Sequence, residues 1–318
     1  MRPPAGYASR PAADRDLDAV VAIVHAAQLA TMGTTEDVRE ELAWIWQVPH
    51  VDRTRDTVLV TAGDDVAGYG DAVWDPASPG PLSGSGVVHP SHRGRGIGTA
   101  ILQWTQDASK ARGTPGLRHG GVYVGDAPAR SLFEENGFSH VRNSYTMARA
   151  LPPGPPPDPP AGIAIRTFET GRDERALYEV HEASFADHWD YVPQPYTSFV
   201  GLWYEPDDWR PELTYLAIAG EEVVGHTAAL EFATGGYVAA IGVLRAWRGR
   251  GIALAMLHRA FADLSSRGHS EVTLGVDATN PTGAIALYEK AGMSVRHEFL
   301  TYDLGTGVTP IGAARMGA

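Results

Sequence analysis

The stretch RGRGIG, at Arg93–Gly98, recurs as RGRGIA at Arg248–Ala253, a spacing of 155 residues. The recurrence lies inside a longer ungapped self-match with the same spacing. That match pairs Val88 with Val243, Arg112-Gly113 with Arg267-Gly268, Leu132 with Leu287, Glu134 with Glu289 and Gly137 with Gly292. One glycine-rich loop carries little information. The same loop, helix end and later helix repeated in register indicate a tandem of one domain.

The bulk composition narrows the class of protein. The chain has 318 residues, which suits two domains that each bury a core. A net charge of −12 argues against a general nucleic-acid binder or a protein that binds anionic membranes. The absence of cysteine excludes disulfides, thiolate nucleophiles and cysteine-ligated metals. The N-terminal sequence lacks an apolar signal region, so we expect a cytoplasmic protein.

A proline-rich segment separates the two copies. Residues 152–160 read PPGPPPDPP, which favours an extended polyproline conformation and a stiff linker. We therefore expect an N-terminal domain at 1–151, the linker at 152–160, a C-terminal domain at 161–304 and a loose tail at 305–318.

Hydrophobic periodicity predicts mixed helices and strands in each copy, which indicates an α/β or α+β layered fold. Helices are expected at 16–29, at 174–185 and after each glycine-rich loop. Strands are expected at 57–62, 66–73, 213–219, 223–232, 237–244 and 271–276.

The glycine-rich loop has the composition of an anion-binding site. Its glycines let the backbone turn sharply, and the following helix offers free N–H groups to a phosphate. Arg93 and Arg95 add positive charge in the first copy, as do Arg245, Arg248 and Arg250 in the second. Neither copy has the Lys-Ser/Thr of a P-loop or the full dinucleotide-binding motif, so an ATPase or a nicotinamide-dependent oxidoreductase is not indicated.

A second segment runs from Asn280 to Met293. Asn280 suits a helix N-cap, Pro281 a first helical residue and Gly292 a helix stop. Tyr288 then lies about 12 Å along the helix axis from Asn280.

Together these two motifs resemble the GCN5-related N-acetyltransferase (GNAT) family, and both copies carry the resemblance. It implies two tandem domains, each with a mixed, splayed central sheet flanked by helices that receives acetyl-CoA or another acyl-CoA. It also implies that Tyr288 protonates the leaving thiolate while an amine attacks directly, and that a backbone N–H polarises the thioester carbonyl. The implied cofactor-binding residues are Ile241, Gly242, Val243, Arg248, Gly249, Arg250, Gly251, Ile252, Ala253, Asn280 and Tyr288, and in the first copy Val87, Val88, Arg93, Gly94, Arg95, Gly96, Ile97 and Gly98.

The two copies differ at the positions that carry chemistry. Tyr288 corresponds to Phe133 and Asn280 to Gly125, so the first copy lacks the phenol and the amide. We therefore expect the C-terminal copy to be catalytic and the N-terminal copy to bind CoA or to have a structural role. Glu231 is the candidate general base. His226, five residues earlier on the same strand, should face the opposite side.

An aromatic and polar segment, Ser184–Tyr191, continues with Trp203, Tyr204 and Trp209 and suits either an acceptor pocket or interdomain packing. Neither His188 with Asp187 and Asp190 nor His89, His92 and His119 has the spacing of a metal site, so no metal is expected.

The sequence favours an acetyl-CoA-dependent N-acetyltransferase that acts on a small-molecule primary amine. A longer acyl-CoA or an acyl carrier protein could be the donor instead. A non-catalytic acyl-CoA sensor is the alternative from another class. Nucleic acid and membrane are not expected as partners, and the chain could be a monomer or a homodimer.

Overall fold

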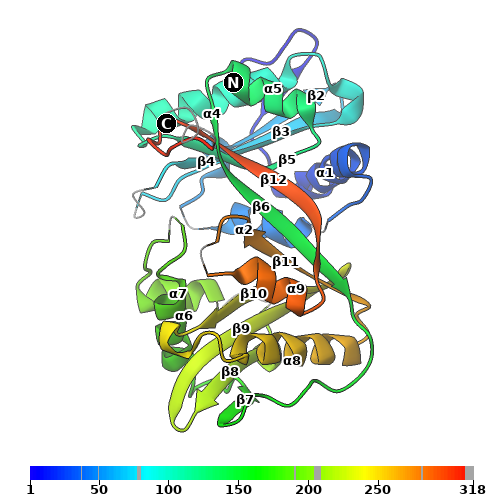
Figure 1. Cartoon of the computed structure of the whole chain (residues 1–318). Helices are drawn as coiled ribbons and strands as arrows, with labels where there is room; N and C mark the ends of the chain where they lie inside the picture. The colour runs from blue at the N-terminus through cyan, green and yellow to red at the C-terminus, as the bar shows by residue number, and fades with distance from the viewer. Residues whose placement is uncertain are drawn as a thin grey trace, which may run out of the picture. The chain divides into compact units, whose positions relative to one another are not determined.

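The computed structural model describes residues 1–36, 38–48, 50–76, 80–189, 191–203, 209–280 and 282–311. It forms two compact units, one made of Met1–Ser144 with Glu298–Ala318 and the other of Tyr145–His297. We call them the N-terminal unit and the C-terminal unit. Each contains a mixed sheet flanked by helices, which confirms the predicted fold class (Figure 1).

The sheet of the N-terminal unit has the strand order β1-β2-β3-β4-β5-β12. The strands are β1 (Ala8–Arg10), β2 (Thr57–Ala62), β3 (Asp65–Val73), β4 (Leu82–Val88), β5 (Leu117–Tyr123) and β12 (Ser294–Leu304). Neighbouring strands are antiparallel except β4 and β5, which are parallel.

Helices cover both faces of this sheet. They are α1 (Leu17–Met32), α2 (Arg39–Gln47), α3 (Arg53–Asp56), α4 (Ile97–Arg112) and α5 (Ala127–Glu135). Val21 of α1 and Trp46 of α2 share a buried cluster with Tyr69 of β3. On the other face, Ile101 of α4 lies over Gly70, where a Cβ atom would approach the Ile101 side chain to 2.6 Å. The glycine therefore lets α4 sit directly on the sheet.

The C-terminal unit repeats this plan with the strand order β6-β11-β10-β9-β8-β7. Its strands are β6 (Ser139–Ala150), β7 (Ile163–Thr167), β8 (Thr214–Ala219), β9 (Glu222–Phe232), β10 (Gly235–Val243) and β11 (Glu271–Asp277). Its helices are α6 (Glu174–Phe185), α7 (Tyr196–Trp203), α8 (Ile252–Ser266) and α9 (Ala284–Lys290). Helix α8 lies along the strands and buries Met256, Leu257 and Phe261 in their core (Figure 1).

The last strand of each sequence repeat completes the sheet of the other unit. Strand β6 belongs to the first repeat, yet Met147 lies in the core of the C-terminal unit and Leu151 donates a backbone hydrogen bond to Ser270 (2.8 Å). Strand β12 belongs to the second repeat, yet Leu300 and Tyr302 lie in the core of the N-terminal unit. The predicted ranges 1–151 and 161–304 therefore describe the sequence repeat, whereas the compact units exchange their final strands.

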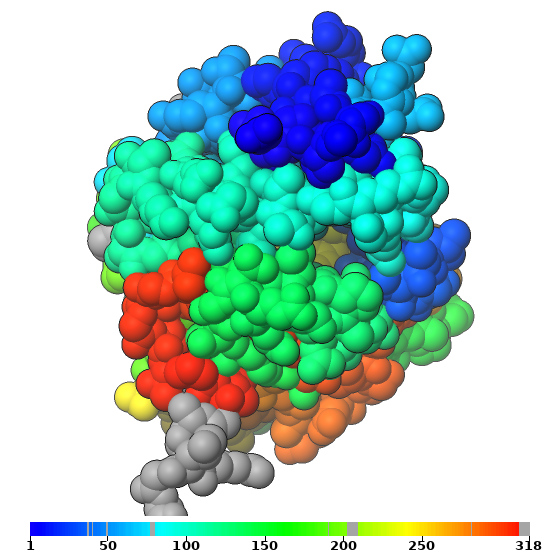
Figure 2. Space-filling view, turned by 90° about the horizontal axis from the view of Figure 1, so that it is seen from above, coloured from blue at the N-terminus to red at the C-terminus, as the bar shows by residue number. Residues whose placement is uncertain are grey.

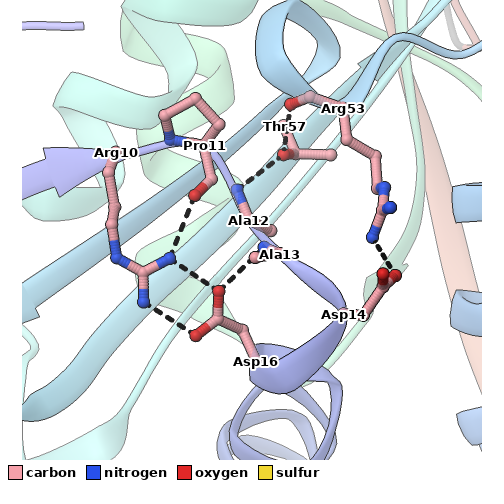
Figure 3. Close-up of polar contacts among 8 residues, drawn as sticks. All are labelled: Arg10, Pro11, Ala12, Ala13, Asp14, Asp16, Arg53 and Thr57. Carbon is pink, nitrogen blue, oxygen red and sulfur yellow. Dashed lines mark hydrogen bonds and ion pairs between the residues drawn. The ribbon is translucent and has the colours of Figure 1, made fainter.

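A repeated ion pair joins β1 to the start of α1 and β7 to the start of α6. Figure 3 shows that Arg10 donates to both carboxylate oxygens of Asp16 (2.6 and 2.7 Å) and that the Ala13 backbone N–H donates to the same carboxylate. In the C-terminal unit Arg166 and Asp173 form the same bidentate pair. The arginine and the aspartate are six residues apart in the first copy and seven in the second. The pair therefore falls outside the ungapped match and was not predicted.

Most predicted elements match observed ones, and the ranges predicted for 57–62 and 174–185 coincide with β2 and α6. Helices α2 and α7 and the long strands β6 and β12 were not predicted. Residues 152–160 form neither helix nor strand. Beyond Leu304, the described residues end in a backbone hydrogen bond from Ile311 to His140 (2.8 Å).

Candidate active site

The two glycine-rich loops adopt the same backbone conformation. Gly249 and Gly251 have φ angles of +77° and +81°, and Gly94 and Gly96 have +73° and +81°. Side chains other than hydrogen rarely adopt these angles, so the repeated glycines are required by the turn. Helices α8 and α4 begin at the next residue, Ile252 and Ile97. Their first N–H groups have no partner within the helix, so both loops can cradle an anion.

A proline that precedes the first strand lies against the second glycine of each loop. A Cβ atom on Gly96 would lie 3.6 Å from Pro4, and one on Gly251 would lie 3.6 Å from Pro160. In the N-terminal unit, Arg95 also donates a hydrogen bond to the Tyr7 hydroxyl (3.2 Å). Figure 2 shows these first residues in dark blue against the cyan surface that includes the loop. Arg95 is thus already engaged by the N-terminal segment.

Each sheet opens between its two parallel strands. Strands β10 and β11 pair at Gly236 with Val272 and at Tyr237 with Thr273, near the start of both strands. Strands β4 and β5 pair over three positions, ending at Gly84 with His119. Beyond these positions neither described pair of strands continues in register. The result is the predicted splay, which exposes backbone groups of β10 and β4 on the way to the glycine-rich loop.

The C-terminal unit has a β-bulge at this opening. The register between β9 and β10 shifts between Val238 and Ala240, which leaves Ala239 without a partner residue on β9. In the N-terminal unit, β3 and β4 pair without a shift from Gly68 with Val88 to Val73 with Ser83. A bulge frees backbone groups and redirects them. In the C-terminal unit, Ala239 therefore lies outside the β9–β10 register where β10 and β11 separate, whereas β3 and β4 keep a regular ladder.

Tyr288 of α9 lies in the core cluster that surrounds this opening. Its exposed fraction is 7%, and the cluster includes Val238 and Leu274, which follow the last parallel pair of strands. Burial, with a smaller contribution from Tyr237, raises the pKa of Tyr288 to about 12. The phenol is therefore protonated throughout the physiological pH range.

The corresponding position in the N-terminal unit is closed by core packing. Phe133 stacks on Tyr302 with ring centroids 5.1 Å apart and an interplanar angle of 12°. His119 lies 5.0 Å from the Phe133 ring, and its Nε2 is 3.1 Å from the hydroxyl of Thr105. Burial lowers the pKa of His119 to about 4, so this imidazole is neutral. No proton donor is present at position 133.

Asn280 does not cap a helix, which corrects the sequence prediction. Helix α9 begins at Ala284, after Gly283 with a φ of +76°. The Asn280 side chain instead accepts a hydrogen bond from the backbone of Thr282 (2.8 Å), which forms a local turn after β11. Pro281, predicted as the first helical residue, lies outside the described residues. A side chain that can bond its own backbone two residues on competes with helix initiation. Gly292, with a φ of +82°, follows the end of α9 as predicted.

The loop arginines have different partners. Arg248 donates to the carbonyl oxygens of Val243 and Ser184 and to the Asp187 carboxylate, each at 3.1 Å. It therefore ties the loop to the end of β10 and to α6. Arg250 is exposed, and its guanidinium lies 4.6 Å from the Trp247 ring centroid.

Glu231 and His226 point to opposite sides of β9, as alternation predicts. The Glu231 carboxylate accepts from Arg267 (3.1 Å) and pairs with His269 (3.0 Å), both just after α8. One oxygen is therefore held in an ion pair with Arg267 and the other in a contact with the His269 ring. His226 is 1% exposed and packs below α6, where its ring lies 5.1 Å from that of His181. Burial lowers the pKa of both histidines.

The aromatic segment after α6 packs largely within the C-terminal unit. Phe185 stacks on His181 with centroids 4.3 Å apart, and Trp209 lies 5.3 Å from Phe168. The Tyr191 hydroxyl donates to Glu182 (2.5 Å). Asp190, Tyr204 and the side chain of Trp203 lie outside the described part of the chain. These contacts favour a packing role for the described aromatic residues.

Among the described residues, no group of three or more histidine, aspartate and glutamate side chains is arranged to hold a metal ion. None of the helices described here is long and apolar enough to cross a membrane.

Comparison with known proteins identifies related sequences and folds. Residues 175–293 match the profile described as "Acetyltransferase (GNAT) family", and residues 54–140 match the profile described as "Acetyltransferase (GNAT) domain". A mycothiol acetyltransferase of Thermobispora bispora is 35% identical over 74% of this chain and 79% of its own length. A GCN5-related N-acetyltransferase of Sphaerobacter thermophilus is 34% identical, with a TM-score of 0.82 over 95% of this chain and 96% of its own. A tandem GNAT protein from the clavulanic acid biosynthesis pathway shares the fold at 14% identity, with a TM-score of 0.69 over 95% and 99% of the two chains.

Proposed function

The chain belongs to the GCN5-related N-acetyltransferase (GNAT) family, and from this premise we propose that its C-terminal unit transfers an acetyl group from acetyl-CoA to the primary amine of a small molecule. The bulge at Ala239 carries this assignment, because it lies where β10 and β11 separate, whereas the equivalent pairing of β3 and β4 in the N-terminal unit has no bulge. Tyr288, in the same core cluster, supplies the proton donor.

The residues of this unit fit a CoA thioester. The N–H groups at the start of α8, beyond Gly249 and Gly251, suit its pyrophosphate. The final residues of β10, Ile241–Val243, offer backbone groups to the pantetheine arm. Arg248 donates to the carbonyl oxygen of Val243 and so holds the loop against β10. Its proposed role is to position the loop that binds the cofactor. Asn280 and Arg250 stay proposed contacts of lesser weight, since their side chains have local partners.

The reaction forms an N–C bond and breaks a C–S bond, so that amine and acetyl-CoA give an N-acetyl amide and free CoA. Acetyl-CoA supplies the activated acetyl group. Unpaired backbone at Ala239 would donate a hydrogen bond to the thioester carbonyl oxygen. The Tyr288 hydroxyl would give its proton to the departing sulfur and regain one that the nitrogen releases. We do not propose Glu231 as the base, because its oxygens are held by Arg267 and His269.

The N-terminal unit keeps the anion-binding loop but lacks the bulge and the phenol. We propose that it binds CoA or supports the fold without acetyl transfer at position 133. One arginine of this loop, Arg95, already donates a hydrogen bond to Tyr7.

The acceptor is a finer proposal. The relative from Thermobispora bispora is a mycothiol acetyltransferase, so a mycothiol synthase-like activity is the first to test, with cysteinyl-glucosaminyl-inositol as the acceptor. A natural-product N-acyltransferase that uses a longer acyl-CoA or an acyl carrier protein is the alternative. A panel of primary amines, with thiol release from acetyl-CoA as the readout, separates these from a non-catalytic acyl-CoA sensor, for which all amines fail while CoA binds.

Paired substitutions test the assignment of the active unit. Tyr288→Phe should lower kcat by about 10²- to 10⁴-fold. Tyr302→Phe removes a buried hydroxyl from the N-terminal unit and should leave turnover unchanged. Gly251→Ala and Gly96→Ala impose the same strain, at a φ of +81° in both loops. The first should raise the KM for acetyl-CoA and the second should not. If activity survives Tyr288→Phe but is lost in Gly96→Ala, the active units have been assigned the wrong way round.

A further inference from the structure

A buried carboxylate in the N-terminal unit has no ion pair with any residue that the structure describes. Five aspartates are buried in the described part of the chain, with exposed fractions of 6% or less: Asp16, Asp56, Asp71, Asp173 and Asp303. Four of them pair with arginine: Asp16 with Arg10, Asp56 with Arg55 and Arg112, Asp173 with Arg166, and Asp303 with Arg118. Among these five only Asp71 has no ion pair. A buried charge without an opposite charge is costly, so this one has a reason to be kept.

Asp71 accepts a hydrogen bond from the neighbouring strand. The Ser85 hydroxyl of β4 donates to its carboxylate at 2.6 Å. Tyr69 lies two residues earlier on the same face of β3, and its hydroxyl accepts a hydrogen bond from the Trp46 indole (2.8 Å). Burial raises the pKa of Asp71 to about 6, hydrogen bonds from Ser85 and Tyr69 act against that rise, and the charge of Glu41 adds to it. The carboxylate is therefore mostly ionised at pH 7.

This carboxylate lies next to the opening of the sheet. Ser85 directly follows Gly84, the last residue of β4 that pairs with β5. Ser83 and Ser85 are exposed, so one hydroxyl group separates Asp71 from solvent on the face that α1 and α2 cover. Ser85 is thus the exposed neighbour past which a ligand would reach the carboxylate.

The fold itself does not require these polar residues. The strand registers place Ala228 of β9 where the N-terminal unit has Asp71, and Ala240 of β10 where it has Ser85. Both alanines are buried in the C-terminal unit, with exposed fractions of 3% and 5%. The same structural position is thus apolar in one unit and carries a carboxylate and a hydroxyl in the other, where Asp71 is 5% exposed and Ser85 is exposed.

We propose that the N-terminal unit binds the primary ammonium group of a small molecule at Asp71, on the α1–α2 face of β3 and β4. A carboxylate and hydroxyls match the charge and the hydrogen-bond donors of an ammonium group. A divalent metal ion would need several oxygen ligands, and the described residues offer no cluster of three. N-acetylation removes the positive charge, so this site distinguishes an amine from its acetylated form.

The Trp46 indole is a reporter for this site, because it bonds to Tyr69 beside Asp71. The full chain, labelled with ¹⁵N in tryptophan side chains, is titrated with propylammonium chloride, and Trp46→Phe assigns the resonance. Sodium chloride at equal ionic strength and the uncharged N-propylacetamide are run in parallel. We expect a saturable shift of the Trp46 resonance with propylammonium alone. A shift that sodium reproduces, or no saturable shift, overturns the proposal.

Matched variants complete the test. Asp71→Asn keeps the shape of the side chain and should weaken propylammonium binding by at least tenfold. Asp64→Asn removes a charge from an exposed turn of the same unit and should leave binding unchanged. If Asp71→Asn does not fold, the wild-type chain at pH 5 and pH 7 decides. Protonation of Asp71, with Glu41 and Tyr69 as its titratable neighbours, should weaken binding about tenfold at pH 5. Equal binding at both pH values, or in Asp71→Asn, contradicts the proposal. None of these readouts depends on acetyl transfer.

Discussion

Replacing Asp71 with asparagine should stabilise the N-terminal unit, and the gain should grow with pH. Burial is the main reason that the pKa of Asp71 rises from 3.8 to about 6. A carboxyl group with a higher pKa in the folded chain than in the unfolded chain binds its proton more tightly when folded. Its ionisation therefore lowers stability as the pH rises through this interval. A shift of about two pKa units corresponds to about 3 kcal/mol, present in full above pH 7.

Paired urea titrations at pH 5 and pH 8, without added amine, isolate this effect. Constant differences in packing between aspartate and asparagine cancel when the two pH values are compared. About half of the cost is already present at pH 5, so the advantage of Asp71→Asn should increase by about 1 to 2 kcal/mol at pH 8. Asp64→Asn, in an exposed turn, should show no such increase. An advantage of Asp71→Asn that is constant or shrinks between pH 5 and pH 8 refutes the reasoning.

Three further substitutions test individual contacts. Deleting Ala239 should restore a regular ladder between β9 and β10, and acetyl transfer should fall by at least about 100-fold while CoA still binds in calorimetry; unchanged kcat would show that the bulge is dispensable. Arg248→Lys loses the forked contacts to Val243 and Ser184, so the KM for acetyl-CoA should rise about tenfold with little change in kcat; a loss confined to kcat would contradict a positioning role. Asp303→Asn breaks the buried pair with Arg118 (both contacts 2.8 Å) and should cost about 3 kcal/mol in urea unfolding; a loss below about 1 kcal/mol would mean that Arg118 finds another partner.

The sequence predicted the features that depend on local chemistry. Gly94, Gly96, Gly249 and Gly251 have φ angles of +73° to +81°, which explains why they recur at the same spacing. Strand β2 and helix α6 follow directly from the spacing of apolar residues. The missing phenol of the N-terminal unit follows from Phe133 alone. In each of these three cases, the residue types at the positions themselves decide the local structure or chemistry.

What the sequence could not predict depends on pairing between distant segments. Strands β6 and β12 exchange between the units, and a self-match cannot say which sheet a long strand joins. The turn at Asn280 arose because its side chain bonds to Thr282 rather than to a helix. The contacts of Glu231 with Arg267 and His269 required knowledge of where α8 ends. Asp71 was overlooked because a lone aspartate in a strand carries no motif.

The bulge at Ala239 marks where the two repeats, which match in sequence, begin to differ in structure. The register from Val88 and Val243 backwards is equivalent in the two units until Ala239, which is the one extra residue in β10. At the position of the proton donor, the C-terminal unit has Tyr288 and the N-terminal unit has Phe133. At the position where β9 matches β3, the polarity is reversed, with Ala228 in the C-terminal unit and Asp71 in the N-terminal unit. A copy that had merely lost its function would be expected to lose polar groups at both positions. The N-terminal unit instead carries a buried carboxylate without an ion pair among the described residues, and its burial lowers stability, which is the pattern expected of a site kept for a ligand.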